Sequence, residues 1–479
     1  MRSAEKVVII HTNDLHSHFE TMPRISTAIR SIRDRRRDAF CILADIGDHA
    51  DRMRLETEGT EGMANRAVLD YCGYDVAVPG NNEGLTLSKR QLAALYGEDA
   101  GFEAVCCNMV EYGTLEPLPW LKPYRIMTNG RVNVGLIGVT ADFNDFYHEL
   151  GWHLLPPLEA VAKWTAFLRA KVDLLIVCSH LGLHRDKEMA ESIPGIDCIL
   201  GGHTHHVLEE PLMIGDTMIC AAGKYGEYVG AAEFVLDPDR KTILSRSAVC
   251  HDPSVFRPDP SLEQLILRYR MQAKDKLGES VVDLPVRLDN AWNTESPLGN
   301  LLARGLKEWT GAEAAIVNAG QILGPLDCGS ITREMILEIC PSPINPCRMK
   351  LQGSAIKQAL EESLLDEFIA MPIKGFGFRG KALGTLCLDG IQVEYDPHAP
   401  AFRKITVIRV NGEDLDEDRW YDVATIDMFT FGIGYLSLKQ GKDIVYYLPE
   451  FIRDVLVSQL RKPDNVQDSF RPRWKPARE

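Results

Sequence analysis

The sequence predicts an α/β fold in which buried parallel strands end in polar side chains of the kind that bind ligands. Five short, apolar, β-branched runs occur in the first half of the chain, at residues 7–10, 40–43, 76–78, 174–177 and 198–200. A polar cluster closely follows each run. Runs of this length fit buried strands. Because open α/β sheets bind ligands at the carboxyl ends of their strands, we expect these clusters to meet at one edge of a sheet.

The side chains in these clusters are carboxylates, imidazoles and one amide. They are Asp14, His16, Asp48, Asn81, His180, His203 and His205. Residues two apart in an extended chain point the same way, so Asp14 with His16, and His203 with His205, can each reach one cavity. A set without thiolates suits divalent Mn, Fe, Co or Zn rather than a structural zinc site. Seven ligands exceed the need of one tetrahedral ion, and a carboxylate such as Asp48 could bridge two ions, so we predict two metals.

The clusters differ in how specific they are. A single Asp-x-His is also common in solvated turns. The run Gly201-Gly202-His203-Thr204-His205 is more specific, because paired glycines after a strand let the backbone approach a ligand closely. The five clusters together, each behind an apolar run, indicate a metal site.

The ordered blocks resemble a known family. Asp14-Leu15-His16, Gly47-Asp48, Gly80-Asn81-Asn82-Glu83, Ser179-His180 and Gly201-Gly202-His203-Thr204-His205 resemble those of calcineurin-like metallophosphoesterases. The opening His11-Thr12-Asn13-Asp14-Leu15-His16 resembles the 5′-nucleotidase and UDP-sugar hydrolase branch. The resemblance implies a four-layer α/β/β/α sandwich. It also implies one metal on Asp14, His16, Asp48 and His205, and a second on Asp48, Asn81, His180 and His203, with Asp48 as the bridge.

The second half resembles the C-terminal α/β domain of 5′-nucleotidases. The matching blocks include residues 294–302, 317–320, 349–353, 390–396 and 421–425. We expect a metallophosphoesterase domain over 1–250, a linker with a helix at 261–277 over 251–280, and a substrate-binding domain over 281–460. The tail 461–479 is polar and contains proline, so we expect it to be poorly ordered. The arginine-rich stretch 30–37 is expected to be a solvated helix end.

One departure from the family concerns proton transfer. The family's third block usually reads Gly-Asn-His-Glu followed by Phe-Asp, whereas this chain has Asn82 at the His position and Gly84-Leu85 after it. An amide donates a hydrogen bond but cannot deliver a proton near neutral pH. Asn82 therefore remains a candidate donor to the phosphoryl group. His184 and His206 are candidate acids. The alternative is that each is simply exposed, or contacts a metal ligand rather than the substrate.

The positions that would bind substrate also differ from the pattern of the 5′-nucleotidase C-terminal domain. The resemblance makes Asn318 a candidate substrate contact, but Gln321-Ile322-Leu323 stands where relatives carry a phosphate-binding Arg. One base-stacking aromatic is missing near Thr385, and the other falls at Met428 or Phe429. The loop 375–380, with Phe376, Phe378 and Arg379, could replace these contacts. The alternative is a glycine-rich loop whose two Phe side chains fill the core.

Whole-chain properties fit an enzyme acting on a small substrate. The chain has 479 residues and a net charge of −15, which opposes general nucleic-acid binding. There is no apolar stretch long enough for a bilayer and no basic-then-apolar leader. The twelve cysteines are scattered, many in strand-like runs, which favours reduced thiols. We therefore expect a cytoplasmic protein without a membrane or nucleic-acid partner, and the sequence leaves its oligomeric state undetermined.

The predicted function is dinuclear-metal phosphoester hydrolysis. A hydroxide bridging the two ions would attack phosphorus in nucleotides or related small organic phosphates. Nucleotide diphosphate cleavage or cyclic phosphodiester cleavage is the first alternative, because an acidic leaving group tolerates a missing acid. A metal- and nucleotide-binding protein with weakened catalysis is the second.

Overall fold

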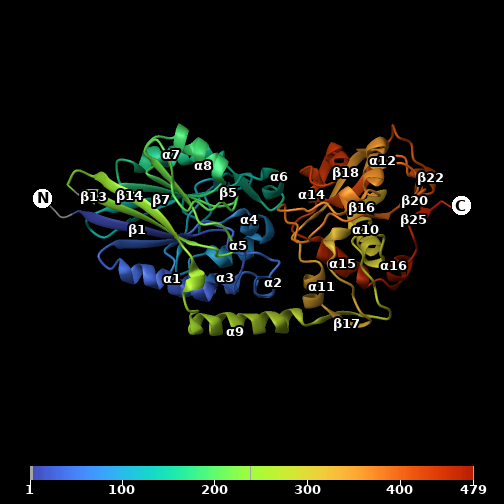
Figure 1. The fold of residues 1–479 in the computed structure, drawn as a ribbon, viewed down its shortest axis with the longest axis horizontal. Coiled ribbons are helices and arrows are strands. Elements are labelled where there is room, and N and C mark those ends of the chain that lie inside the picture. The colour runs from blue at the N-terminus through green and yellow to red at the C-terminus, as the bar shows by residue number, and fades with distance from the viewer. Residues whose placement is uncertain (1–3, 238, 478–479) are drawn as a thin grey trace. The chain divides into compact units, whose positions relative to one another are not determined.

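The computed structural model describes residues 4–237 and 239–477 and divides into two compact units between Ala273 and Lys274 (Figure 1). The N-terminal unit is built on two sheets. The first runs in the order β14 (Thr242–His251), β13 (Val229–Asp237), β1 (Glu5–Thr12), β2 (Phe40–Asp45), β3 (Val76–Ala77) and β4 (Glu103–Ala104). The second runs β11 (Leu212–Ile214), β12 (Thr217–Ala221), β10 (Cys198–Gly201), β9 (Leu174–His180), β7 (Asn133–Thr140) and β6 (Tyr124–Thr128). A separate ribbon pairs β5 (Met109–Glu111) with β8 (Trp152–Leu154).

The five predicted strands are present in these two sheets. β1, β2 and β3 pair in parallel in the first sheet, and β9 and β10 pair in parallel in the second. The helices of the unit are α1 (Met22–Arg35), α2 (Leu55–Thr60), α3 (Met63–Cys72), α4 (Asn81–Thr86), α5 (Lys89–Tyr96), α6 (Asn144–Tyr147), α7 (Pro157–Leu168), α8 (Leu183–Ser192) and α9 (Pro260–Leu277). α9 confirms the helix predicted at 261–277.

The sheets and helices stack in four layers. Alternate residues of β1 point to opposite faces, so Ile9 packs between the sheets while Ile10 packs outward against α1 and α3. On the other side, Val177 of β9 packs outward against α7 and α8 through residues such as Val161 and Met189. This arrangement is the predicted α/β/β/α sandwich. All strand ends that carry the ligand candidates belong to it.

The sequence of α1 explains both its burial and its basic end. Ile25, Ala28, Ile29 and Ile32 recur at helical spacing and are buried. Basic side chains occupy the last turn, where they complement the helix dipole. Beyond the helix, Arg36 pairs with Glu233 at 2.7 Å at the surface. The predicted solvated helix end is therefore confirmed.

Over residues 274–477, the C-terminal unit contains three sheets. A two-stranded sheet joins β15 (Ser280–Leu284) and β17 (Gly329–Thr332). A larger sheet runs β19 (Leu386–Asp389), β16 (Ala314–Asn318), β23 (Trp420–Ile426), β18 (Pro346–Gln352) and β24 (Lys442–Tyr446). The third runs β22 (Glu413–Asp414), β21 (Ile405–Val410), β20 (Ile391–Tyr395) and β25 (Trp474–Pro476). The helices are α10 (Pro297–Thr310), α11 (Arg333–Ile339), α12 (Gly353–Glu362), α13 (Asp366–Ile369), α14 (Asp427–Thr430), α15 (Ile452–Leu460) and α16 (Pro463–Asp468).

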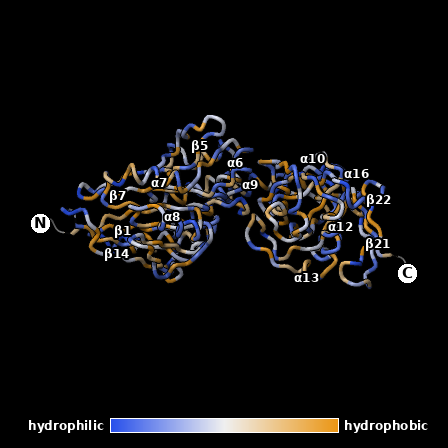
Figure 2. Tube along the Cα trace, turned by 90° about the horizontal axis from the view of Figure 1, so that it is seen from above, coloured by the Kyte–Doolittle hydropathy of each residue, from blue (hydrophilic) through white to orange (hydrophobic). Residues whose placement is uncertain are grey.

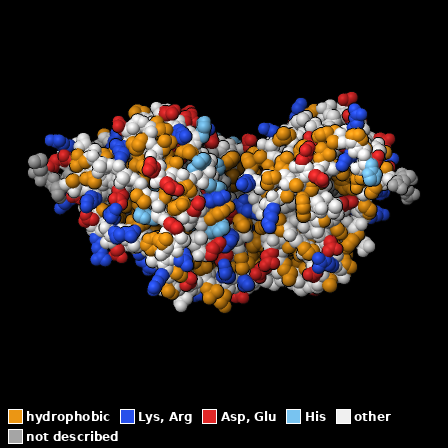
Figure 3. Space-filling view, viewed as in Figure 1, with side chains coloured by type: hydrophobic (Ala, Val, Ile, Leu, Met, Phe, Trp, Pro, Cys, Tyr) orange, Lys and Arg blue, Asp and Glu red, His pale blue; other side chains and the backbone are white. Residues whose placement is uncertain are grey.

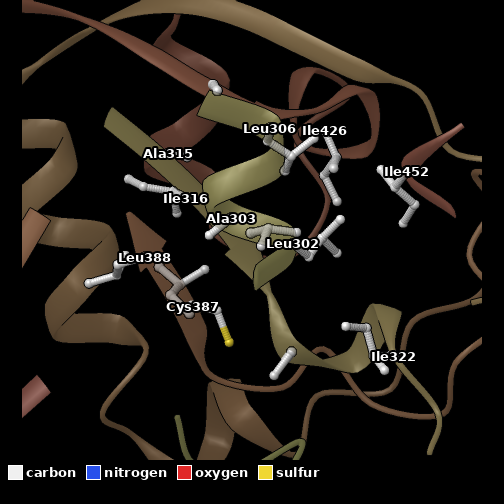
Figure 4. Close-up of a cluster of buried hydrophobic side chains, with 14 of the residues drawn as sticks. Leu302, Ala303, Leu306, Ala315, Ile316, Ile322, Cys387, Leu388, Ile426 and Ile452 are labelled. Carbon is white, nitrogen blue, oxygen red and sulfur yellow. The ribbon is translucent and has the colours of Figure 1, made fainter. Parts of the chain in front are cut away.

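Helix α10 forms the centre of this unit's core. Ser296 caps it by accepting a hydrogen bond from the Gly299 amide at 3.3 Å, and Gly311 ends it in the left-handed conformation. Its buried face packs on β16 and β19, where Leu302 and Leu306 lie near Ile316 (Figure 4). The core is thus separate from that of the N-terminal unit.

The expectation of a poorly ordered tail is wrong for residues 461–477. They form α16 and β25, and Trp474 and Arg473 are buried. Arg473 bonds Asp468 at 2.7 Å and Asp389 at 3.2 Å, and the Trp474 indole donates to the Leu386 carbonyl at 2.9 Å. Long-range polar contacts therefore order a segment with few apolar residues. Residues 478 and 479 lie outside the described part.

None of the described helices combines the length and the apolar character needed to cross a bilayer. Hydrophobic and hydrophilic stretches interleave along the trace of both units (Figure 2). All twelve cysteines are free thiols, and most are buried, as predicted. At the surface, Lys and Arg side chains alternate with Asp and Glu over the visible face (Figure 3).

Candidate metal centre

The seven ligand candidates lie at the carboxyl ends of strands from both sheets. Asp14 and His16 follow β1, Asp48 follows β2 and Asn81 begins α4 after β3. His180 ends β9, and His203 and His205 follow β10. The structure brings them together in two neighbouring groups.

The first group consists of Asp14, His16 and His205. The His205 Nε2 atom lies 3.4 Å from Asp14 Oδ1 and 3.4 Å from His16 Nε2. Asp14 also accepts the backbone N–H of His203 at 3.0 Å, which ties the loop after β10 to the loop after β1. The ligand atoms lie within 4.8 Å of one another, so one ion could contact all three side chains.

The second group consists of Asp48, His180 and His203, again with ligand atoms within 4.8 Å. The Nε2 atom of His180 lies 3.2 Å from Asp48 Oδ1 and 3.2 Å from the Asn81 amide oxygen. The other oxygen of Asp48, Oδ2, lies 3.8 Å from His16 Nε2 in the first group. One carboxylate therefore faces both groups, as bridging requires.

Hydrogen-bonding partners that are not ligand candidates orient the imidazoles of His180 and His16. His180 donates through Nδ1 to the carbonyl of Ile46 at 2.8 Å, which leaves Nε2 facing Asp48. His16 Nδ1 lies 3.2 Å from Asp51 Oδ2 on its outer side. Such contacts fix the tautomer and ring orientation of metal-binding histidines. Asp51 was missed in the sequence, although it stands only three residues after Asp48.

The backbone around the groups is crowded and strained. A Cβ at Gly80 would lie 2.1 Å from Asp48 Oδ1, and one at Gly47 would lie 2.7 Å from His180 Nδ1. Five of the ligand candidates have left-handed backbones: Asp14 (φ 52), His16 (46), Asp48 (52), His203 (71) and His205 (58). Non-glycine residues adopt this conformation at a cost, and such strain clusters at functional sites.

The site concentrates buried negative charge. Burial alone would raise the pKa of Asp48, but the His180 and His16 imidazoles outweigh it and hold the pKa well below its usual range. Burial lowers the pKa of His180, yet Asp48 outweighs this and raises it to about 10. Burial, followed by the Asp48 charge, raises the pKa of Glu83 to about 8. A divalent cation would take the place of the imidazole protons, so the donor set fits metal ions.

The three candidates for proton transfer are placed differently. Asn82 lies at the site, but its Nδ2 already donates to Asp48 Oδ2 at 3.0 Å and lies 2.8 Å from His16 Nδ1. His184 is exposed on α8. No hydrogen bond joins it to either set of ligand candidates in the described residues, 4–237 and 239–477. His206 is exposed and bonds the Thr204 hydroxyl at 2.9 Å. Only Asn82 is therefore brought to the ligand candidates.

The substrate-binding candidates differ in whether their side chains are buried or exposed. Asn318 is buried, donates to the Leu383 carbonyl at 2.6 Å and accepts from Gln321 at 3.1 Å, so its side chain holds the turn together. Phe378 and Phe429 are 4% and 0% exposed and lie in the core, so neither presents a stacking face here. Burial thus corrects the expectation for these two rings.

Phe376 and Arg379, in the loop 375–380, lie nearer the protein surface. Phe376 is 50% exposed, and its ring centroid lies 5.7 Å from that of Phe431. Arg379 is half-buried, and its amide donates to Ser342 Oγ at 3.1 Å. Phe431 was missed because the sequence cannot show that 376 and 431 face each other.

The fold and this site together define a metal-dependent phosphoesterase. Both halves of the chain match family models: residues 7–207 match calcineurin-like phosphoesterase, and residues 276–438 match the C-terminal domain of 5′-nucleotidase. The chain belongs to the calcineurin-like phosphoesterases that carry a 5′-nucleotidase C-terminal domain.

Several known proteins are similar over the full length. The chain is 36% identical to the uncharacterized metallophosphoesterase YunD of Bacillus subtilis, covering 95% of this chain and 99% of that one. The NAD nucleotidase of Haemophilus influenzae has the same fold, with a TM-score of 0.68, 16% identity and coverage of 100% and 98%. The 5′-nucleotidase precursor of Thermus thermophilus matches with a TM-score of 0.61, 22% identity and coverage of 99% and 100%.

Proposed function

We propose that this phosphoesterase uses two divalent ions to hydrolyse nucleotides or related small organic phosphates. The observation that carries the proposal is the position of Asp48, with one oxygen 3.2 Å from His180 and the other 3.8 Å from His16. Asp14, His16, Asp48 and His205 would hold one ion, and Asp48, Asn81, His180 and His203 the other. The donor set of oxygens and imidazoles fits Mn, Zn, Fe or Co.

The residues around the ions have separate tasks in this proposal. Bound ions would supply an activated water and positive charge for the phosphoryl oxygens. Asp51 and the Ile46 carbonyl would keep His16 and His180 in the orientations that face the ions. Asn82 would hold Asp48 in place through two hydrogen bonds, rather than deliver a proton to the leaving group.

The C-terminal unit supplies a candidate site for the base of a nucleotide. Phe376 and Phe431 are both exposed, with ring centroids 5.7 Å apart, and an aromatic base can stack on such rings. Phe376→Ala and Phe431→Ala should each raise KM for AMP by about tenfold, since one stacking contact is worth about 1–3 kcal/mol. KM for glycerol phosphate, which has no base, should stay unchanged. Phe402→Ala, at a ring that is also exposed in the same unit, is the control.

A diphosphate substrate is the second candidate. The absence of an acid at position 82 favours it, because a phosphate leaving group needs no proton.

Phosphate release from AMP, UDP-glucose, a dinucleotide and a chromogenic diester should be measured with the Mn-loaded protein, alongside its metal content. We expect two metals per chain and turnover of at least one nucleotide. Nucleotide binding without phosphate release under any divalent ion would refute hydrolysis and indicate a binding protein.

A further inference from the structure

Strand β14 forms an open edge of the first sheet in the N-terminal unit. Its ten residues, Thr242–His251, pair with β13 on one side. On the other side they pair with no strand in the described ranges 4–237 and 239–477. The remaining edge strands of the two sheets are shorter, with two residues in β4, three in β11 and five in β6. In the part of this unit that the structure describes, β14 is therefore the longest open row of backbone donors and acceptors.

β14 lacks most of the features that keep an open edge from pairing. Proteins protect such edges with Lys, with other charged side chains, with Pro or with a bulge that bends the strand away. Residues 242–251 contain no Lys, Asp, Glu or Pro. The guanidinium of Arg246 donates to the carbonyl of Asp216, so this charge is held against the unit's own backbone. The one register shift with β13 lies near the start of the strand, at Leu244, and leaves residues 245–251 in regular pairing.

The exposed side chains of β14 are small or apolar. Leu244 and Val249 are 57% and 49% exposed, and Ser245 and Ser247 are exposed as well. Because alternate residues of a strand share a face, Ser245, Ser247 and Val249 point the same way from the sheet. A strand added along this edge would meet no charged side chain of β14 on that face, and it would cover part of Val249.

The two ends of β14 carry opposite charges. Arg240 and Lys241 precede the strand, and their side chains are 78% and 66% exposed. The exposed Asp252 follows it. In an antiparallel pair of identical strands, each basic end lies beside the acidic end of the other copy, whereas a parallel pair would bring like charges together. The charges therefore favour antiparallel pairing with a second copy of this chain, which is the arrangement that a two-fold axis generates.

The same symmetry restricts how the two copies can be aligned. Residues opposite each other in an antiparallel pair share a face, so the axis passes through one residue of β14. An axis at Ser247 overlaps residues 243–251 and places Ser245 opposite Val249 of the other copy. An axis at Arg246 would overlap as many residues, but it would set two guanidinium groups opposite each other, which is destabilising. Of these two alignments, the one centred on Ser247 is favoured.

We propose that the chain forms a two-fold dimer in which the β14 strands of two copies pair antiparallel about Ser247. The first sheets of the two copies then continue into one another across the axis. Backbone hydrogen bonds hold the strands together, and the contacts of Val249 and of the charged ends fix their alignment. None of the seven ligand candidates lies on β14, so dimer formation does not depend on the proposed function.

The test measures the mass of the full chain in solution by analytical ultracentrifugation over a range of protein concentrations. We expect the wild type to form dimers. Ser247→Lys and Ser247→Glu should each raise the dissociation constant of the dimer by about tenfold or more, because each sets two like charges opposite each other at the axis. An equimolar mixture of the two variants should form dimers again, because Lys then faces Glu. Thr128→Lys, at an exposed position on the edge strand β6, is the matched control and should leave the dimer unchanged.

Three other results would each overturn the inference. A wild-type protein that stays monomeric at every concentration would show that the edge of β14 does not pair. Dimers that persist unchanged in both Ser247 variants would place the contact on another surface. Variants that are monomeric alone and remain monomeric in the mixture would exclude an axis at Ser247. Each of these results would leave the metal centre and its proposed reaction unaffected.

Discussion

Asp48 Oδ1 lies 3.2 Å from His180 Nε2, while Oδ2 of the same carboxylate lies 3.8 Å from His16 Nε2. This one side chain connects imidazoles that come from strands of two different sheets, β1 and β9. Because the two oxygens face different groups, the loss of Asp48 affects both groups at once. A ligand that belongs to one group alone would affect only that group.

Asp48→Ala should therefore remove metal loading and turnover together. We expect the metal content to fall from two ions per chain to well below one, because both groups lose a carboxylate oxygen. Metal content is measured by mass spectrometry after dialysis, and activity is measured on the same sample. Asp38→Ala, at an exposed acidic residue paired with Lys6, is the control and should retain both. Activity retained with one bound metal would exclude the bridging role.

Gly80→Ala tests the close approach of the backbone to Asp48. The new Cβ would lie 2.1 Å from Asp48 Oδ1 and 2.3 Å from its backbone nitrogen, so the carboxylate must move. We expect metal affinity to fall sharply, with a loss of about 1–3 kcal/mol in unfolding free energy from overpacking. Calorimetry with Mn and a urea titration measure the two effects. Gly324→Ala, where the nearest atom would be 3.5 Å away, should change neither.

Asp51→Ala tests whether the contact at His16 Nδ1 orients the ligand. Removing the carboxylate 3.2 Å from that atom should weaken metal binding by about 10–100-fold, the usual effect of losing an orienting partner. Asp51→Asn keeps an oxygen acceptor and should lie between the alanine variant and wild type. Metal titrations of the three proteins give the order. Equal affinities would show that the contact with Asp51 is not needed to orient the ring.

The candidate ligands could be located from the sequence because each polar cluster follows a strand. The apolar run and the polar cluster are local features, and parallel pairing brings their ends together. The contacts that orient these ligands were not predictable. The amide of Tyr225 reaches Asp14 across more than two hundred residues, and no local pattern records that contact.

The substrate side shows the limit of local patterns more clearly. Alternating Gly and Phe at 375–378 left open which ring faces solvent, and the structure exposes Phe376 while it buries Phe378. The tail was misjudged for a related reason. Its order depends on Arg473 and on carboxylates from distant elements, such as Asp389, rather than on an apolar run.

Asp427 should give the C-terminal unit a stability that depends on pH. Burial raises the pKa of this carboxyl to about 7, although the amide of Asn345 donates to it at 3.0 Å. Since the ordinary value is 3.8, the folded protein holds a proton between these two pH values that the unfolded chain has lost. The unfolded state then binds fewer protons, so unfolding free energy falls as pH rises from about 4 to about 7, by up to about 1.4 kcal/mol per pH unit. Below this window the stabilisation is fully present, and above it the loss is complete.

Asp427→Asn should flatten this dependence, because an amide cannot ionise while its oxygen still accepts from Asn345. Urea unfolding of wild type and variant at pH 5 and pH 8, followed by a probe in the C-terminal unit, measures the difference. We expect the stability of the variant relative to wild type to be higher at pH 8 than at pH 5, because only the wild type loses stability between these two pH values. Asp366→Asn, at an exposed carboxylate that begins α13, is the control. If the Asp366 variant alone altered the slope, or if wild type and the Asp427 variant kept the same slope, burial of Asp427 would not be the cause.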